Sequence, residues 1–326
     1  MISSVEGKTY LVTGAAGMLG SFVVDRLAEL GAAVIALDIA EPRIGFGHAP
    51  HPGVRDVSVD ILDQEALAKV VVGCSGIVHI AAMLTRLVQK NPVRGFEVNV
   101  GGTHRLLEAA ANEGMERFVL ASSGTTYGRA APEGGGLQEN APLIGRSFYA
   151  ASKIASELYC EAYAYERGLD YVAFRLGTMY GPRLGPNGNV ASYLHSALQE
   201  SSSPTVRIPL DPDDSRDLVY VADVAECLIR GLTSERANLS LNVGTGFLTP
   251  NRDLFEALIA AVGSDGEIEW HPEQATVKAH GRFLDMKRTA EVIGYVPDTP
   301  IEVGLREFVE WREALPEADR PMPAFA

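Results

Sequence analysis

Tyr149 and Lys153 form a Tyr-x-x-x-Lys pair, a spacing that places both side chains on one face of a helix. A phenol can donate or accept a proton, but at its ordinary pKa only about one tyrosine in a thousand is ionised at pH 7. A nearby ammonium stabilises the phenolate and lowers that pKa. The pair therefore predicts proton transfer by Tyr149 with help from Lys153, and the alternative is a surface tyrosine beside a solvated lysine.

A glycine-rich segment near the N-terminus has the features of a phosphate-binding turn. Glycines at three-residue spacing follow the apolar run 10–12 and open the amphipathic stretch 18–30. Between a strand and a helix, such glycines allow a tight turn and let a pyrophosphate approach bare amides at the positive end of the helix. We expect a dinucleotide site that includes Gly14, Gly17, Met18, Leu19 and Gly20.

Two carboxylates follow the next apolar runs and bear on the choice of dinucleotide. Asp38 ends the run 33–37, where a carboxylate can accept hydrogen bonds from an adenosine ribose and would repel a 2′-phosphate. NAD is therefore favoured over NADP. Asp60, followed by Ile61, comes after the run 57–59 and is expected near the adenine edge, with a solvated loop position as the alternative.

Short apolar runs alternate with longer helical patterns over the first half of the chain. The runs lie at 9–13, 33–37, 57–59, 77–80, 118–121 and 171–174. Such alternation is typical of right-handed βαβ units and of a parallel sheet covered on both faces. The sequence predicts the α/β class and a doubly wound, parallel-sheet Rossmann fold.

After residue 174 the predicted elements become shorter, and Gly-Pro pairs separate them. We expect an NAD-binding domain over residues 1–175, joined by returning segments at about 217–243. Residues 176–216 and 244–326 are expected to form a smaller α/β substrate-binding lobe. An amphipathic helix is expected at 300–316.

Composition excludes several classes of function. The 326 residues are 46% hydrophobic and carry 28 basic against 42 acidic side chains, a net charge of −14. Such a surface repels nucleic acid and anionic lipid, so neither is expected as a partner. The apolar runs end well before the ~20 residues of a membrane helix, and the N-terminus is short and polar, so we expect neither a membrane helix nor a cleavable signal.

The cysteine content indicates a reducing environment. Cys74, Cys160 and Cys227 are odd in number and far apart, which fits neither a disulfide framework nor a thiolate metal site. We therefore expect a cytoplasmic protein without a metal, whose partner is a small molecule.

Further motifs extend the pattern over nearly the whole chain. The sequence resembles the extended short-chain dehydrogenase/reductase family, and within it the NAD-dependent sugar-nucleotide epimerase/dehydratase branch. The segments that occur in the order of that family, beside the two motifs above, are 79–82 (His-Ile-Ala-Ala), 99–103 (Asn-Val-Gly-Gly-Thr), 122–128 (Ser-Ser-Gly-Thr-Thr-Tyr-Gly), 180–182 (Tyr-Gly-Pro), 216–225 (Arg-Asp-Leu-Val-Tyr-Val-Ala-Asp-Val-Ala) and 242–244 (Asn-Val-Gly).

The resemblance implies roles for residues around the Tyr-Lys pair. It places Ser123 beside Tyr149 to hold the substrate oxygen, with Thr125 as an auxiliary group. It also places Tyr149 and Lys153 at the nicotinamide ribose. The further residues implied at the cofactor are Ala81, Ala82, Asn99, Arg175 and residues 177–179. His79 is expected to be a buried, hydrogen-bonded strand histidine.

For the substrate, the resemblance implies contacts by Thr178, Arg216 and Arg282. An asparagine is common at the position of Thr178 in UDP-sugar epimerases, so the identity of the substrate stays open. Arg216 commonly meets a diphosphate, and Arg282 is a candidate for a second such contact. Structural salt bridges to Asp217 or Asp285 are the alternative for both arginines.

Several activities are compatible with these residues. We expect an NAD-dependent epimerase of a sugar or nucleotide sugar, with Tyr149 as acid/base. A dehydrogenase of a sugar or other secondary alcohol, which releases NADH, is the first alternative, and an NAD-sensing binding protein is the second. A 4,6-dehydratase is disfavoured because Gly124 and Thr125 replace the Asp-Glu pair of those enzymes. The resemblance also implies a homodimer through the helices at about 92–113 and 148–167, with Leu158, Ala162 and Tyr165 at or near the interface.

Overall fold

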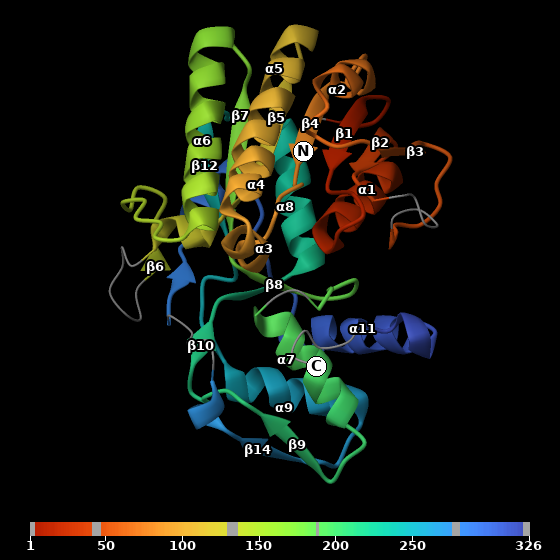
Figure 1. The fold of residues 1–326 in the computed structure, drawn as a ribbon, viewed down its shortest axis with the longest axis vertical. Helices are drawn as coiled ribbons and strands as arrows, with labels where there is room; N and C mark the ends of the chain where they lie inside the picture. The colour runs from red at the N-terminus through yellow and green to blue at the C-terminus, as the bar shows by residue number, and fades with distance from the viewer. Residues whose placement is uncertain (1–3, 41–46, 129–135, 187–188, 276–280, 322–326) are drawn as a thin grey trace.

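The computed structural model describes residues 4–40, 47–128, 136–186, 189–275 and 281–321. At its centre lies a seven-stranded parallel sheet in the order β12-β7-β5-β4-β1-β2-β3 (Figure 1). This arrangement confirms the predicted doubly wound Rossmann fold. The strands are β1 (Thr9–Thr13), β2 (Ala33–Asp38), β3 (Val54–Ser58), β4 (Gly76–His79), β5 (Arg117–Ser123), β7 (Tyr171–Leu176) and β12 (Leu239–Val243).

Helices cover both faces of the sheet, which is why its inner strands are apolar at nearly every position. Leu11 packs in the core on one face, and its neighbour Val12 packs in the core on the other. The Val12 face is covered by α1 (Met18–Glu29) and α8 (Val221–Thr233). The Leu11 face is covered by α2 (Gln64–Val70), α5 (Thr103–Glu113) and α6 (Phe148–Arg167).

The edge strand β3 begins earlier than its apolar run predicts. It spans Val54–Ser58, whereas the run lies at 57–59. The strand includes Arg55 and Asp56, and its side chains are half-buried or exposed because only one neighbour, β2, pairs with it. An edge strand tolerates polar residues, so hydrophobicity alone misplaces its start.

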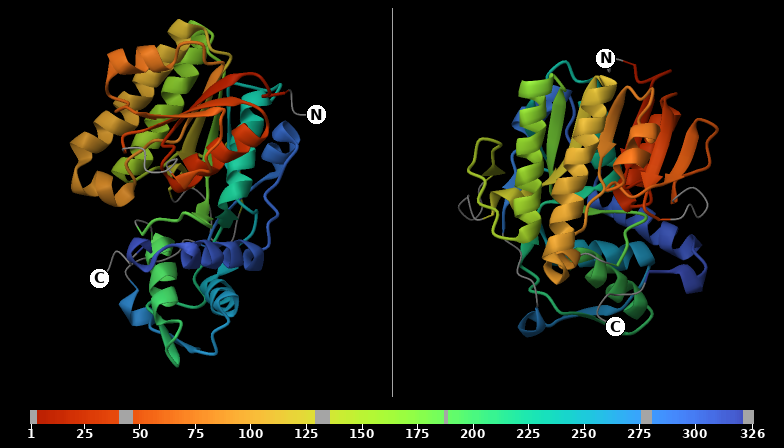
Figure 2. Two further views of the ribbon diagram at one scale, coloured as in Figure 1. Left: turned by 90° about the vertical axis from the view of Figure 1, so that its right-hand side faces the viewer. Right: turned by 45° about the horizontal axis from the view of Figure 1, so that its top comes forward.

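A smaller lobe lies below the carboxyl edge of the sheet (Figures 1 and 2). Its helices are α7 (Asn189–Glu200), α9 (Asn251–Val262) and α11 (Ile301–Ala314), and its outer strands β9 (Thr205–Ile208) and β14 (Glu267–Trp270) pair in parallel. The expected terminal helix at 300–316 is α11, which packs on α9 and buries Phe308.

Short strand pairs connect the lobe with the sheet domain. They are β8 (Thr178–Tyr180) with β11 (Leu218–Tyr220), β10 (Ser215–Arg216) with β13 (Thr249–Pro250), and β6 (Gly136–Leu137) with β15 (Phe283–Leu284). Of the segments expected to return at 217–243, α8 covers the sheet and β12 extends it. The expectation for β11 needs correction, because this strand pairs with β8 outside the main sheet.

The remaining helices and helical turns are short. They are α3 (Thr85–Lys90), α4 (Pro92–Phe96), a π-helical turn at Glu97–Gly102, α10 (Lys287–Ile293), and 3₁₀ turns at Gly124–Tyr127, Pro272–Gln274 and Glu317–Asp319. Within the described residues, no helix combines the length and apolarity needed to span a membrane.

The close packing of the turn that joins β1 to α1 can be tested at Gly20. A Cβ atom at Gly20 would lie 2.0 Å from the carbonyl oxygen of Gly14, whereas a Cβ atom at Gly17 would lie 3.3 Å from the same atom. The Gly20→Ala substitution should therefore lower the free energy of unfolding by about 1–3 kcal/mol, the usual cost of overpacking. Gly17→Ala is the matched control with a smaller effect, and equal denaturant midpoints for the two variants would contradict this account.

Candidate active site

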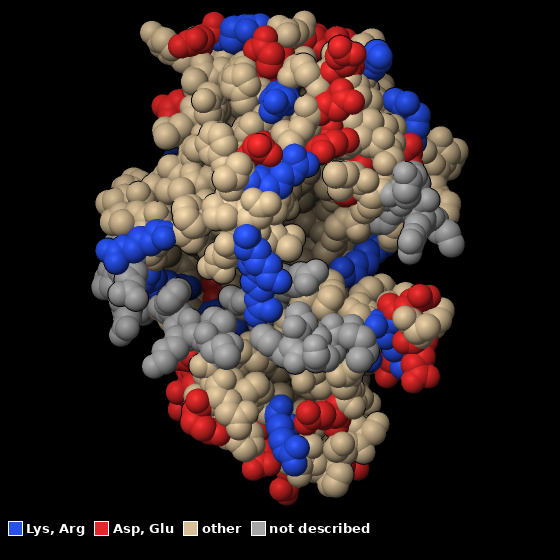
Figure 3. Space-filling view, in the orientation of Figure 1, with Lys and Arg blue, Asp and Glu red and all other residues tan. Residues whose placement is uncertain are grey.

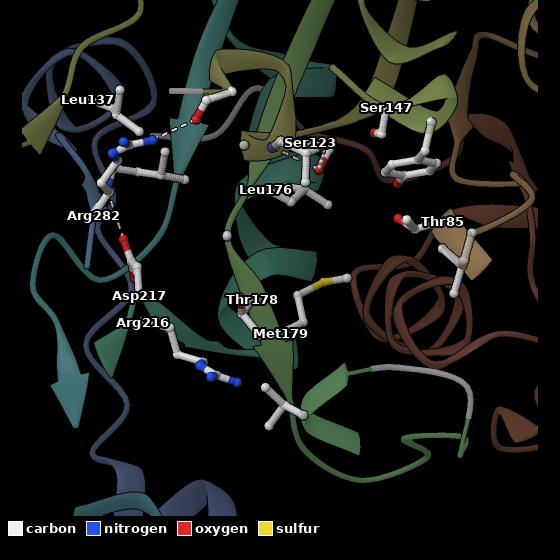
Figure 4. Close-up of a pocket in the computed structure, with 18 of the residues that line it drawn as sticks. Thr85, Ser123, Leu137, Ser147, Leu176, Thr178, Met179, Arg216, Asp217 and Arg282 are labelled. Atoms are coloured by element: carbon white, nitrogen blue, oxygen red, sulfur yellow. Dashed lines mark hydrogen bonds between the residues drawn. The ribbon is translucent and has the colours of Figure 1, made fainter. Parts of the chain in front are cut away.

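A pocket of about 510 Å³ lies between the carboxyl edge of the sheet and the smaller lobe. Its walls include Ser123 and Leu176 at the ends of two sheet strands, Tyr149 at the start of α6, and Arg216 and Arg282 from segments on the lobe side (Figure 4). Figure 3 shows a hollow between the two parts of the molecule on one face, with basic side chains near it. The pocket occupies the edge where ligands bind in open parallel sheets.

Tyr149, Lys153 and Ser123 come together in this structure. The hydroxyl of Ser147 accepts a hydrogen bond from the amide of Ala150 at 3.1 Å and so caps the start of α6. The Lys153 ammonium lies 5.8 Å from the centre of the Tyr149 ring, and the Tyr149 hydroxyl is hydrogen-bonded to Ser123. Two elements, α6 and β5, thus position a phenol, an ammonium and a hydroxyl.

Burial controls the protonation of this group. It raises the pKa of Tyr149 to about 12, against the opposing effect of the hydrogen bond to Ser123. It also lowers the pKa of Lys153 to about 8, while the Glu157 carboxylate acts in the other direction. The sequence predicts a lowered pKa for Tyr149, so the direction found for the protein groups alone is the opposite. Ionisation of Tyr149 near pH 7 therefore requires further positive charge in the pocket.

Ser123 ends β5 and is held by its neighbour. Its hydroxyl oxygen accepts hydrogen bonds from the Thr125 amide at 3.2 Å and from the Thr125 hydroxyl at 2.9 Å. Because the Ser123 oxygen is the acceptor in both contacts, its own hydrogen can still be donated to another group. Thr125 lines the same pocket and, through these contacts, fixes the orientation of the Ser123 hydroxyl.

The glycine turn forms a cradle that fits a pyrophosphate. Gly14 has a φ of +73°, and a Cβ atom there would lie 2.8 Å from the amide nitrogen of Ala81. The N-cap of α1, Gly17, makes no side-chain capping bond, and the first turn of this helix contains no acidic residue. The amides at this positive helix end are therefore suited to an anion.

Asp38 supports the same turn from the end of β2. Its carboxylate accepts hydrogen bonds from the amide of Ala16 at 3.0 Å and from that of Ala40 at 3.2 Å. A carboxylate has about four acceptor positions, so capacity remains for a ribose diol. The part of Asp38 at the cofactor stays a prediction.

Asp60 is engaged elsewhere in the fold. Its carboxylate pairs with Arg94 at 3.0 Å and accepts a hydrogen bond from the Leu62 amide at 2.9 Å. Ile61 is buried, and its side chain would collide with a Cβ atom at Gly102. In the protein itself, these two residues attach the loop after β3 to α4 and to the π-helical turn.

Asn99 fixes the loop that contains Ala81 and Ala82. Its side-chain oxygen accepts a hydrogen bond from the amide of Met83 at 2.7 Å, and its side-chain nitrogen donates to the Met83 carbonyl at 3.0 Å and to Ser152 at 3.1 Å. All of these groups are buried or half-buried. Asn99 thereby connects the loop after β4 with α6, one residue away from Lys153.

His79 is a structural residue, as the sequence predicts. One ring nitrogen lies 2.8 Å from the Thr13 hydroxyl, and the other lies 2.9 Å from the Thr103 hydroxyl. Burial lowers the pKa of His79 to about 3, with a further contribution from Lys153. The ring is therefore neutral and joins β1, β4 and α5.

The two arginines of the pocket do not form the ion pairs that were the alternative. Asp217 is buried and accepts hydrogen bonds from the amides of Thr245 at 2.7 Å and Leu284 at 2.9 Å. Asp285 accepts one from Gln138 at 3.2 Å. Within the described part of the chain, neither carboxylate has an ion pair with Arg216 or Arg282.

Both arginines keep unused donors at the pocket. Arg216 is 9% exposed, and one terminal nitrogen of its guanidinium has no hydrogen-bond partner among the described residues. Arg282 donates to the carbonyl of Gly128 at 2.6 Å, while its Nε lacks a partner in the same part of the chain. Unpaired buried donors are costly, so an anion between the two lobes would satisfy them. Thr178 lies on the pocket wall between Ser123 and Arg216 (Figure 4).

Sequence reasoning missed one buried ion pair and several residues of the pocket wall. Arg175, expected near the nicotinamide, directs its guanidinium to Glu157 at 2.7 Å. The available signal was a glutamate four residues after Lys153, on the same helix face. The missed wall residues lack a distinctive pattern and include Leu84, Thr85, Ser147, Leu184 and Val190.

Comparisons with known proteins agree with this geometry. A model of the NAD dependent epimerase/dehydratase family matches residues 10–244. The UDP-glucose 4-epimerase of Mycolicibacterium smegmatis is 34% identical over 92% of this chain and 97% of its own. Among solved structures, the UDP-glucose 4-epimerase of Thermotoga maritima with UDP-glucose has a TM-score of 0.83 at 29% identity, covering 93% of this chain and 98% of that one. The Thermus thermophilus UDP-glucose 4-epimerase with NAD has a TM-score of 0.80 at 32% identity, covering 94% and 100%.

The part of Asp38 in cofactor choice can be measured by calorimetry with NAD and NADP. Asp38→Ala should weaken NAD binding by about 10- to 100-fold, the effect of losing a hydrogen bond to a charged acceptor, and should narrow the preference over NADP. Asp38→Asn retains an acceptor for Ala16 and controls for damage to the turn. Glu65→Ala, which removes an exposed charge, should leave both constants unchanged. Equal affinities of the unsubstituted protein for NAD and NADP would overturn the assignment.

Proposed function

The chain belongs to the NAD-dependent epimerase/dehydratase family, and we propose that it inverts the configuration of a hydroxyl-bearing carbon in a nucleotide sugar. The family model and the relatives confirm the predicted membership of the extended short-chain dehydrogenase/reductase enzymes and the dependence on NAD. The observation that carries the proposal is the pocket itself, where Tyr149 and Ser123 share the wall with two arginines that have unused donors, and Lys153 is buried next to Tyr149.

The two ends of the pocket suit the two parts of such a substrate. At the sheet end, hydroxyl groups of Ser123 and Tyr149 are suited to a sugar hydroxyl or a carbonyl oxygen. At the lobe end, Arg216 and Arg282 are suited to a diphosphate, which guanidinium groups bind through paired hydrogen bonds. The pocket volume of about 510 Å³ lies in the range of ligand sites. UDP-glucose in the Thermotoga maritima enzyme is a substrate of this shape.

The residues of the cradle would hold NAD with its pyrophosphate at Gly14–Gly20 and its adenosine ribose at Asp38. When bound, NAD supplies a hydride acceptor and a positive charge beside Tyr149. Tyr149 then removes the proton of the sugar hydroxyl, and Ser123 holds the oxygen by hydrogen bonding. The Lys153 ammonium stabilises the phenolate. Tyr149 returns the same proton when the opposite face of the sugar has been reduced, so the reaction leaves no net oxidation.

Local structure opposes the dehydratase reaction of other family members. The two residues after Ser123 are Gly124 and Thr125, and the Thr125 hydroxyl is hydrogen-bonded to Ser123. Elimination of water requires an acid and a base for its proton transfers, and neither residue supplies one. A dehydrogenase that releases NADH stays as the alternative, since it uses the same three residues. The NAD-sensing protein is disfavoured because the complete Tyr-Lys pair is present.

Incubation with a panel of UDP- and dTDP-sugars tests the proposed reaction. We expect one 4-epimer to form without net release of NADH, and mass spectrometry of the purified protein should find retained NAD. Tyr149→Phe should abolish turnover and leave NAD binding nearly intact, because only a hydroxyl is lost. Ser123→Ala should lower turnover by about 10²–10⁴, and Lys153→Met should reduce both turnover and NAD binding.

Tyr159→Phe removes a hydroxyl from the same helix at an exposed position and is the matched control. Its turnover should equal that of the unsubstituted protein. Stoichiometric NADH release on a substrate would favour the dehydrogenase. Full turnover of Tyr149→Phe would contradict both activities.

An apolar surface on α4 and α6 supports a homodimer. Large side chains are exposed here, with 60% of Leu158 and 91% of Tyr165 accessible, and Ala162 lies between them on α6. On α4, Val93 and Phe96 are also exposed. Because soluble monomers rarely expose contiguous apolar patches, we propose that a second copy of the chain covers this surface. The buried, unpaired cysteines are consistent with the proposed cytoplasmic location.

Leu158→Glu should convert the dimer to a monomer, since it places a charge in the apolar contact. Val72→Glu is the control, because Val72 is similarly exposed but lies outside α4 and α6. Sedimentation at micromolar concentration distinguishes the two states. Purely monomeric unsubstituted protein would refute the proposed dimer.

A further inference from the structure

A buried ion pair of Glu157 and Arg175 lies one helical turn from Lys153 and has no part in the chemistry described above. Glu157 is on α6, one turn after Lys153, so the two side chains share a helix face. Glu157 is 5% exposed and Lys153 is 4% exposed. Arg175 of β7 donates to the Glu157 carboxylate from its terminal nitrogen at 2.7 Å and from Nε at 3.1 Å. The guanidinium thus holds the carboxylate through hydrogen bonds from two of its nitrogens.

Lys153 and Glu157 are attached to consecutive residues of the same strand. The Lys153 ammonium donates to the carbonyl of Ala121 at 2.7 Å, and the hydroxyl of Ser122 donates to Glu157. Ser240 of β12 donates to the same carboxylate at 3.0 Å. Glu157 therefore joins α6 to three neighbouring strands, β5, β7 and β12, one turn away from the ammonium.

Other charged and ionisable groups surround this pair. The Arg175 guanidinium also donates to the Tyr127 hydroxyl at 3.0 Å and to the Glu139 carbonyl at 2.9 Å. On the side of α5 and the π-helical turn, Asn99 and Thr103 are hydrogen-bonded to Ser152 and Ser156 of α6, and none of these four residues ionises. The groups near Lys153 or Glu157 are Tyr127, Tyr149, Cys160, Tyr171, Arg175 and His79, and Arg86 of α3 lines the same pocket as Tyr149.

We propose that Glu157 is a positioning residue of the active site, which holds the Lys153 side chain against β5 and maintains its positive charge. A buried ammonium without a nearby carboxylate reverts to the neutral amine, because burial penalises the charged form. Burial already lowers the pKa of Lys153 to about 8, and among the charged groups that act on it Glu157 has the largest opposing effect. Loss of Glu157 would therefore discharge Lys153 in the pH range where Tyr149 must ionise. The link to catalysis rests on the proposed function, but the charge of Lys153 can be measured without a substrate.

The alternative is that Glu157 and Arg175 only stabilise the fold. Removing one partner of a buried ion pair is strongly destabilising, whereas replacing both by uncharged residues often restores stability. Stability measurements therefore cannot separate the two ideas. The protonation of Lys153 can, because a purely structural pair would leave it unchanged.

The chain contains six lysines, so ¹³C labelling at Cε gives few NMR signals. The signal absent from Lys153→Met identifies Lys153, and its pH titration is then followed in the full-length protein as purified, with its nucleotide content measured. In Glu157→Gln, the midpoint for Lys153 should fall by about one pH unit, the lower end of the effect of an adjacent opposite charge. In Arg175→Met, where the carboxylate loses its partner cation, the midpoint should stay at or above that of the unsubstituted protein.

The double variant E157Q/R175M guards against misfolding of the single variants. Its Lys153 midpoint should still lie below that of the unsubstituted protein, because the Glu157 carboxylate, which raises the pKa of Lys153, has been removed. Glu157→Asp, which restores the charge, should recover part of the midpoint. Unchanged Lys153 midpoints in Glu157→Gln and in the double variant would overturn the proposal, whatever their stability. Absence of epimerase activity with shifted midpoints would instead count against the proposed reaction alone.

Discussion

The parallel direction of the central strands is the constraint on which the site depends. Parallel strands end at the same edge of a sheet, so the residues that follow them are neighbours whatever their distance in sequence. Thr13 is in register with Leu37 and with His79, and Ser123 is in register with Leu176. The glycine turn, Asp38, the loop with Ala81 and the Ser123 hydroxyl therefore gather along one edge. The smaller lobe lies against this edge and completes the pocket.

Burial at that edge disfavours the charged forms of ionisable side chains, and the protein compensates for only part of this effect. Low polarity favours the neutral forms of both Tyr149 and Lys153, and the pKa values of about 12 and about 8 reflect it. The chain supplies one compensating carboxylate, on Glu157, and relies on a positively charged cofactor for the rest. With only protein groups around it, the phenol of Tyr149 stays protonated near pH 7, so the proposed proton transfer depends on the charge that the cofactor adds.

The sequence allowed the sheet, the glycine turn and the Tyr-Lys pair to be predicted, because each depends on local spacing. The apolar runs identify inner strands that are buried on both faces, whereas the half-exposed β3 was misplaced. Long-range partners were harder to predict. Glu157 forms an ion pair with Arg175, and Asp217 accepts hydrogen bonds from backbone amides. Both contacts depend on which residues the folded chain brings together. The direction of the pKa shift at Tyr149 required knowledge of its burial, which spacing does not contain.

The position of β12 has a consequence for how the chain is synthesised. This strand covers the outer edge of β7, yet 62 residues separate Leu176 from Leu239, and these include α7, β9, β11 and α8. All six residues of β7 are buried in the finished protein. While the ribosome makes the intervening segment, the backbone groups on one side of β7 have no strand to pair with, and such an edge promotes aggregation. Truncations that end before Leu239 lack β12, so we expect them to leave this edge of β7 unpaired and to aggregate more readily than the full chain.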